Sequence, residues 1–211
     1  MRQRKVKHEA ERLAALERYS VHNGMEQKGN WLELFPAQGP LFLELGCGRG
    51  HFISEHAESD REAFFIGCEG RSSIVLRAME LIDEKGLDNV LFIPDFIIRV
   101  GDYFAPGELS GVYLNFSDPW PKARHAKRRL THRSYLLGYK EALCPGGFIE
   151  FKTDNQELFD FTLEECHGAG LVVAECTRDL HKTDLPARLI QTQYERRFRL
   201  LGKPICYCRI Y

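Results

Sequence analysis

The sequence lacks any long hydrophobic run. None of its 211 residues belongs to a stretch that approaches the roughly 20 apolar residues a membrane-spanning helix needs. Residues 1–18 are charged throughout and contain no apolar core, which is unlike a secretory signal peptide. These absences predict a cytoplasmic protein with no membrane anchor.

Paired cysteines are missing as well. The seven cysteines are irregularly spaced and form no Cys-x-x-Cys pair, and Cys206 and Cys208 alternate as residues of a strand do. Others lie in apolar runs, where a cysteine behaves as a small hydrophobic side chain. The pattern argues against a zinc site and against a disulfide framework, predicts no bound metal, and indicates a reducing compartment.

A charge excess of one sign is also absent. The 29 basic and 30 acidic residues give a formal net charge of −1, which argues against a protein that binds nucleic acid over its whole surface. A local basic patch can still bind a polyanion. Hydrophobic residues make up 44% of the chain, enough for the core of one large domain, and there is no internal repeat. Nothing in the sequence separates a monomer from a homodimer.

Two regions differ in character. Residues 1–30 form a basic N-terminal arm or helix, which we interpret as a solvated tail, with an RNA-contacting arm as the alternative. Within residues 31–211, short apolar strands alternate with helices. Strands are expected at 41–45, 63–68, 89–93, 111–116, 148–152, 171–176 and 205–211, and helices at 51–58, 72–85, 131–143 and 156–167. This alternation predicts a doubly wound α/β domain, with a mostly parallel sheet and helices on both faces.

A glycine-rich loop follows the first expected strand and opens a helix, as the run Glu44-Leu45-Gly46-Cys47-Gly48-Arg49-Gly50. Its spacing is GxGxG, whereas dinucleotide-binding proteins have GxGxxG. Glu44 would repel a pyrophosphate but would attract an ammonium or sulfonium group. We therefore expect Glu44, Gly46 and Gly48 to bind S-adenosylmethionine rather than NAD.

Glu69 ends the second expected strand, at the place where an acid commonly binds ribose hydroxyls. The alternative is a glycine turn without a ligand, with Glu69 capping the next helix. Glu44, the three glycines and Glu69 occur together in the correct strand context, which favours cofactor binding.

A second segment, Asn115-Phe116-Ser117-Asp118-Pro119-Trp120-Pro121-Lys122, follows the fourth expected strand. Its two prolines fix φ, so the loop should be stiff. Asp118 could accept a hydrogen bond from the edge of a guanine, and Trp120 could stack on a base. The alternative is a turn with Asp118 as an Asx residue and Trp120 as a buried anchor. We expect Asp118 to be functional, and both roles of Trp120 remain open.

Basic side chains are dense immediately after this loop. They are Lys122, Arg124, His125, Lys127, Arg128, Arg129, His132 and Arg133. Such a run is often only a solvated surface, but its position beside the presumed active-site loop favours contact with the phosphates of RNA.

Five segments together resemble the bacterial tRNA (guanine-N7-)-methyltransferase family. They are LELGCGRGHF, the downstream Glu69, LNFSDPWPKARHAKRRL, FKTDN and TQYERRF, and SDPWPK and TxYE are the most specific. The resemblance implies a Rossmann-like class I methyltransferase domain over 31–211. It implies transfer of a methyl group from S-adenosylmethionine to N7 of a tRNA guanine, usually at position 46 in the variable loop.

The resemblance also implies roles for single residues. Glu44 and Glu69 would hold the cofactor, and Asp118 would be the catalytic residue where cofactor and guanine meet. The residues implied to bind tRNA are Lys122, Asp154, Thr192, Gln193, Tyr194 and Glu195. Without the resemblance, Asp154 would be assigned as a helix N-cap, and Thr192 and Glu195 as surface residues.

The chain departs from the family after the third strand. The family usually has an acid or amide near the adenine there, and this chain has Pro94-Asp95-Phe96-Ile97. Either Asp95 takes that place or Phe96 packs on the adenine ring.

Three rival functions can be compared with these residues. An NAD-dependent oxidoreductase would have GxGxxG and no acid at position 44, and a non-catalytic RNA-binding module would have lost the glycine loop or Asp118. A methyltransferase that acts on another amino group remains open, because the loop at Asp118 resembles those of such enzymes. The basic run and the TxYE segment disfavour it.

Overall fold

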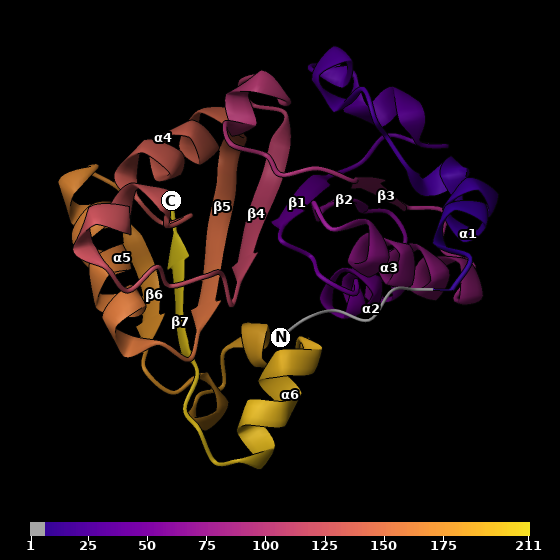
Figure 1. Ribbon diagram of the computed structural model, residues 1–211. Helices are drawn as coiled ribbons and strands as arrows, with labels where there is room; N and C mark the ends of the chain where they lie inside the picture. The colour runs from indigo at the N-terminus through magenta and orange to yellow at the C-terminus, as the bar shows by residue number, and fades with distance from the viewer. Residues whose placement is uncertain (1–6) are drawn as a thin grey trace.

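The computed structural model describes residues 7–211, so the basic residues Arg2, Arg4 and Lys5 lie outside the described part. A seven-stranded sheet crosses the molecule in the order β3-β2-β1-β4-β5-β7-β6 (Figure 1). Its strands are β1 (Leu41–Leu45), β2 (Phe64–Cys68), β3 (Val90–Ile93), β4 (Leu109–Asn115), β5 (Leu143–Thr153), β6 (Val173–Thr177) and β7 (Cys206–Ile210). The strands β1 to β5 pair in parallel, and β7 is antiparallel to both of its neighbours. The predicted doubly wound, mostly parallel sheet is confirmed.

Helices cover the sheet on both faces (Figure 1). They are α1 (Glu9–Ala15), α2 (His51–Ser59), α3 (Ser72–Glu84), α4 (Arg133–Ala142), α5 (Gln156–Gly168) and α6 (Gln193–Leu200). The residues of β2 alternate between two hydrophobic cores. Phe64 and Ile66 join the core that contains α4 and α5, while Phe65 joins the core that contains α2 and α3. Burial on both faces explains why this strand is apolar without interruption.

The described part of the N-terminal region packs against the outer strands. Arg12 of α1 forms an ion pair with Glu80 of α3. The backbone N–H of Val21 donates to the Phe92 carbonyl at 2.8 Å, next to β3. Trp31 is fully buried, and its indole N–H donates to the Tyr103 carbonyl at 2.8 Å. The described residues of the N-terminal region therefore contact the sheet and its helices.

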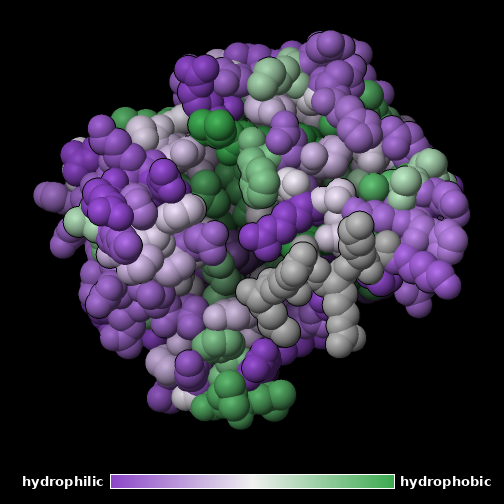
Figure 2. Space-filling model, in the orientation of Figure 1, coloured by the Kyte–Doolittle hydropathy of each residue, from purple (hydrophilic) through white to green (hydrophobic). Residues whose placement is uncertain are grey.

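Two helices differ from the expectation. The expected helix at 131–143 begins at Arg133, because the His132 side chain caps it by accepting a hydrogen bond from the N–H of Ser134. The helix α6 was not expected at all. It lies below the carboxyl ends of β4 and β5 in Figure 1, and its last turn exposes Leu200. Figure 2, in the same orientation, shows hydrophobic side chains at the lower edge of the molecule, where this helix lies.

Candidate active site

Two adjoining pockets lie over the carboxyl ends of the central strands. The first encloses about 560 Å³ and the second about 1030 Å³. Gly46, Asn115 and Phe116 line both, so the two pockets adjoin at these residues, and we call them together the trough. The trough lies between β1 and β4, where the strand order reverses direction, which is where sheets of this kind bind ligands.

The glycine-rich loop forms the floor where the two pockets meet. Gly46 and Gly48 have φ of +76° and +57°, in the left-handed region where a side chain is disfavoured. A Cβ atom on either residue would point into open space. Gly50 has a different role, because a Cβ there would lie 2.9 Å from the Cβ of Ala78 in α3. Gly46 and Gly48 thus keep the floor open, while Gly50 allows α2 to approach α3.

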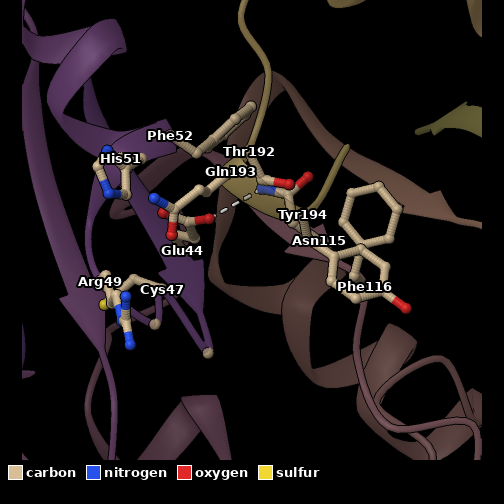
Figure 3. A pocket seen from close by; sticks show the side chains of 12 residues that line it. Glu44, Cys47, Arg49, His51, Phe52, Asn115, Phe116, Thr192, Gln193 and Tyr194 are labelled. Atoms are coloured by element: carbon tan, nitrogen blue, oxygen red, sulfur yellow. Dashed lines mark hydrogen bonds between the residues drawn. The ribbon is translucent and has the colours of Figure 1, made fainter. Parts of the chain in front are cut away.

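Glu44 lies in β1 and projects into the first pocket (Figure 3). Its Oε1 accepts a hydrogen bond from the Asn115 side-chain amide at 2.9 Å, while its Oε2 is buried and has no partner. Burial raises the pKa of this carboxyl to about 7, against the opposing effects of Asn115, the charge of Lys152 and the backbone N–H of Ile53. A buried acceptor without a partner is costly, so the pocket is suited to a ligand that brings a cationic donor to Oε2.

Glu69 and Phe96 both line the second pocket. Glu69 follows β2, and partial burial raises its pKa. The Phe96 ring is 64% exposed and lies over Gly70, where a Cβ atom would come within 2.3 Å of it. Asp95 does not line either pocket, and its carboxylate accepts a hydrogen bond from the N–H of Phe96 at 2.7 Å. Of the two alternatives for the adenine, Phe96 is the one that faces the pocket.

The loop after β4 places the exposed Asp118 side chain in the second pocket. Two residues of this loop have left-handed backbone conformations, Phe116 with φ of 51° and Trp120 with φ of 40°. Such conformations cost on the order of 1–3 kcal/mol each and persist only where surrounding contacts impose them. Here the Arg129 guanidinium donates to the carbonyls of Pro119 and Trp120 at 3.0 and 3.1 Å. The position of Asp118 is therefore imposed by contacts from elsewhere in the fold.

Trp120 is half-buried and lines the second pocket. The Arg128 guanidinium lies 5.0 Å from the centre of its ring, and the His125 ring meets it edge-on at 5.7 Å. The side chain is thus neither a fully buried anchor nor a free stacking platform, because a cation already lies over its ring.

The basic run divides into two parts. Its last three members have partners within the protein, since Arg129 binds the loop carbonyls, His132 caps α4, and Arg133 forms an ion pair with Glu165 at 2.9 Å. The earlier members lie in or beside the short 3₁₀ helix Ala123–Arg128. Lys122, Arg124, Lys127 and Arg128 are exposed there. The first part is therefore the better candidate for contact with a polyanion.

The C-terminal segment forms another wall of the first pocket, through Thr192, Gln193 and Tyr194 (Figure 3). Thr192 caps α6 as part of a capping box with Glu195. The Tyr194 ring stacks on Phe198 with centroids 4.2 Å apart, and its centroid lies 5.0 Å from that of Phe116. Residues far apart in the sequence thus meet across the trough.

Asp154 and Lys122 lie at the margins of this site. The helix α5 is capped by Asn155, whose side chain accepts from the N–H of Leu158 at 2.7 Å, so the expectation that Asp154 is the N-cap is wrong. Burial, and next the charge of Asp154, raise the pKa of the Tyr194 phenol, which puts Asp154 within electrostatic range of this ring. Lys122 is exposed and lines neither pocket.

Glu195 requires a correction. The resemblance implies that it binds tRNA, but its side chain is fully buried and forms an ion pair with Lys152 of β5 at 3.2 Å. A direct contact with tRNA is therefore out of its reach in this structure. Sequence reasoning missed Lys152 and the helix α6, although the spacing Thr192-x-x-Glu195 is the sequence signal of a capping box.

Two kinds of feature are absent from the described part of the chain. Residues 7–211 contain no group of three or more His, Cys, Asp or Glu side chains arranged to hold a metal ion. Within the same residues, no helix is both long and apolar enough to cross a membrane.

The strand order and the glycine loop define a Rossmann-like class I methyltransferase fold. A solved structure with this fold is that of the 16S rRNA methyltransferase KamB, with a TM-score of 0.60 at 11% identity over 86% of this chain and 91% of that one. The family model described as "Putative methyltransferase" matches residues 38–208.

Curated relatives identify the family more narrowly. The tRNA (guanine-N(7)-)-methyltransferase of Lachnoclostridium phytofermentans is 43% identical over 89% of this chain and 87% of its own length. The enzyme of the same name from Brevibacillus brevis is 41% identical over 91% of both chains. This chain belongs to the bacterial tRNA (guanine-N(7)-)-methyltransferase family.

Proposed function

We propose that this protein transfers a methyl group from S-adenosylmethionine to N7 of a guanine in tRNA, at position 46 by its resemblance to the family. The observation that carries the proposal is that two acidic side chains share one trough. Glu44, whose Oε2 is unpaired, lines the first pocket and Asp118 lines the second, and both pockets share Gly46, Asn115 and Phe116. A tRNA substrate also fits the reducing, cytoplasmic location that the unpaired cysteines indicate.

The residues of the trough fit S-adenosylmethionine. The Oε2 atom of Glu44 lacks a donor, and the amino group of the methionine part would supply one. The open floor at Gly46 and Gly48 leaves room for the ligand. Glu69 would bind the ribose hydroxyls, and the exposed Phe96 ring would pack on the adenine. We therefore assign the adenine contact to Phe96 and not to Asp95.

Methylation of guanine N7 requires no proton transfer to a side chain of the protein. The sulfonium of the bound cofactor supplies the methyl group. Guanine N7 carries a free lone pair at neutral pH, so no side chain has to act as a general base. The charge on the purine ring becomes more positive as N7 is methylated, and an acidic side chain beside the base lowers the energy of that change. Asp118 would both orient the guanine edge and stabilise this charge.

The direct test of the function is methyl transfer to an unmodified tRNA transcript, followed by mapping of the methylated nucleotide. The matched control is the same transcript with adenine in place of the guanine at position 46. We expect 7-methylguanine in the first transcript and no methylation of that position in the second. Methylation of a protein or small amine with none in tRNA would instead support the alternative that another amino group is the substrate.

The affinity for the cofactor should depend on pH through Glu44. Its pKa in the free protein is about 7, and an ammonium ligand prefers the deprotonated carboxyl. We expect binding of S-adenosylhomocysteine to tighten as the pH rises through 7, by up to about tenfold per unit below 7, until the ligand amine itself loses its proton. Isothermal titration calorimetry from pH 5.5 to 8 measures this, and a pH-independent affinity would contradict the assignment of Glu44.

The affinity for tRNA should depend on salt through the first part of the basic run. Replacing both Lys127 and Arg128 with alanine should weaken tRNA binding and reduce the slope of log K against log salt by about 1.5 to 2. The matched control removes two exposed cations, Arg61 and Lys140. They precede β2 and β5, at the amino ends of the strands, whereas the site lies at the carboxyl ends. Filter binding over a range of salt concentrations compares the variants, and equal slopes would exclude this surface as the tRNA contact.

A further inference from the structure

Lys152 of β5 is a buried cation that the proposed chemistry does not use, with only 1% of its surface exposed. Its ammonium group donates to the carbonyls of Ala187 and Ile190 at 2.6 and 2.9 Å and to Oε2 of Glu195 at 3.2 Å. An ammonium has three N–H donors, so all of them are used. All three acceptors belong to one segment, residues 187–195. One side chain of the central sheet thus fastens this segment to the fold.

Glu195 is held equally firmly on its other sides. Its Oε1 lies 3.0 Å from Nε2 of His181, a close approach that does not have the geometry of a hydrogen bond, and neither atom has a hydrogen-bond partner among the described residues. Its Oε2 also accepts from the N–H of Thr192 at 3.4 Å, and its own N–H donates to the Thr192 hydroxyl at 2.9 Å. The Glu195 side chain is therefore one half of the capping box at the start of α6.

The start of α6 is also a wall of the site. Residues 192–194 line the first pocket, and the Tyr194 ring packs on Phe116, which lines both pockets. From the opposite side, the Lys152 ammonium lies 5.3 Å from the ring centre of Phe52, another residue of the first pocket. Lys152 thus connects the helix that follows the glycine loop with the segment that closes the trough.

We propose that Lys152 is a positioning residue for methyl transfer, which through Glu195 and the carbonyls of residues 187 and 190 holds residues 192–194 as a wall of the first pocket. The inference rests on the proposed function. A buried ion pair is weak as a source of stability, because apolar residues of similar volume are often as stable in its place. What a pair of charges adds is a single geometry, and here that geometry sets a wall of the active site.

Lys152 also acts on Glu44 through its charge. The Glu44 pKa can therefore be measured as a second effect of Lys152, one that loosened packing alone would not change. Among the groups near Glu44, the charge of Lys152 lowers the Glu44 pKa, while burial raises the pKa values of Cys47 and Tyr113 and keeps them uncharged near neutral pH. The titratable groups that face Lys152 itself are Glu44, Glu150, Glu195, His56 and His181. Loss of the cation should raise the Glu44 pKa. Loss of the Glu195 charge removes the strongest effect that raises the Lys152 pKa, but Glu150, Glu44 and the two carbonyls remain beside the ammonium group, and we expect them to keep it charged.

The test compares Lys152→Met with Glu195→Gln, which keeps the shape of the side chain. The control is Lys182→Met. The Lys182 side chain is 83% exposed, and the substitution removes its surface ion pair with Asp179. We expect kcat/KM for tRNA to fall by roughly tenfold to a hundredfold in the first two variants and to change less than about twofold in the control. Circular dichroism and thermal melting check that each variant is folded.

The second measurement is the pH midpoint of S-adenosylhomocysteine binding, which needs no tRNA. The midpoint should move to higher pH in Lys152→Met and stay at or below the wild-type value in Glu195→Gln. Normal kcat/KM in folded Lys152→Met, or midpoints that move upward together in both variants, would overturn the inference. If Lys152→Met does not fold, Glu195→Gln decides, and normal kcat/KM there overturns the inference.

A wild-type protein that does not methylate tRNA refutes the proposed function instead, while the midpoints still test the role of Lys152.

Discussion

Replacing Asp118 with asparagine is expected to lower kcat for tRNA methylation by about 100- to 1000-fold, the size seen when a group that stabilises transition-state charge is lost. Asparagine has nearly the same shape as aspartate. Because the Asp118 side chain is exposed, the substitution also leaves the core unchanged. Asparagine can still hydrogen-bond to a base but carries no charge. Single-turnover methylation measures the chemical step, and circular dichroism verifies the fold.

The control for this variant is Asp88→Asn, an equally conservative change of an exposed aspartate. Asp88 lies just before β3, at the amino end of that strand and away from the site. It should leave kcat unchanged. Tight binding of S-adenosylhomocysteine by Asp118→Asn, within a few-fold of wild type, would locate the defect in the methylation step. If Asp118→Asn retained near-normal kcat, the assignment of Asp118 as the catalytic residue would be abandoned.

Replacing Glu44 with glutamine should have two opposite effects. The first is a loss of cofactor affinity of roughly 30-fold or more, since removing one partner of a buried charge pair costs about 2–5 kcal/mol. The second is a gain in stability of the free protein at pH 8. Burial raises the pKa of Glu44 from 4.5 to about 7, so the folded state holds this proton more tightly than the unfolded chain does. The stability of the free protein therefore falls as the pH rises from 4.5 to 7 and stays reduced above 7.

A pKa raised by this amount corresponds to a penalty of about 3 kcal/mol at pH 8, which glutamine would remove. We expect Tm of the free Glu44→Gln protein to exceed that of wild type by several degrees at pH 8, and the difference to vanish near pH 4.5. Differential scanning fluorimetry with and without S-adenosylhomocysteine measures both effects. A variant that is less stable than wild type at pH 8, or that binds the ligand as tightly, would show that the unpaired oxygen of Glu44 is not held for a cationic ligand.

The sequence by itself determined the sheet and the floor of the site. Strands such as 64–68 and 90–93 are apolar without interruption because both of their faces are covered, and that pattern is visible without coordinates. The glycine loop was equally visible, because φ values such as +76° at Gly46 leave few other residues possible. These features are local, so they are written in short stretches of sequence.

Only the tertiary structure decided which charged side chains are buried and which remain free. In the basic run, Arg129 holds the loop while Arg128 stays exposed, although the two are neighbours of one residue type. Nothing in the sequence links Lys152 with Glu195, which lie 43 positions apart and form an ion pair only in the folded protein. The energy of a charge depends on its burial and on partners from distant segments, and a short stretch of sequence records neither.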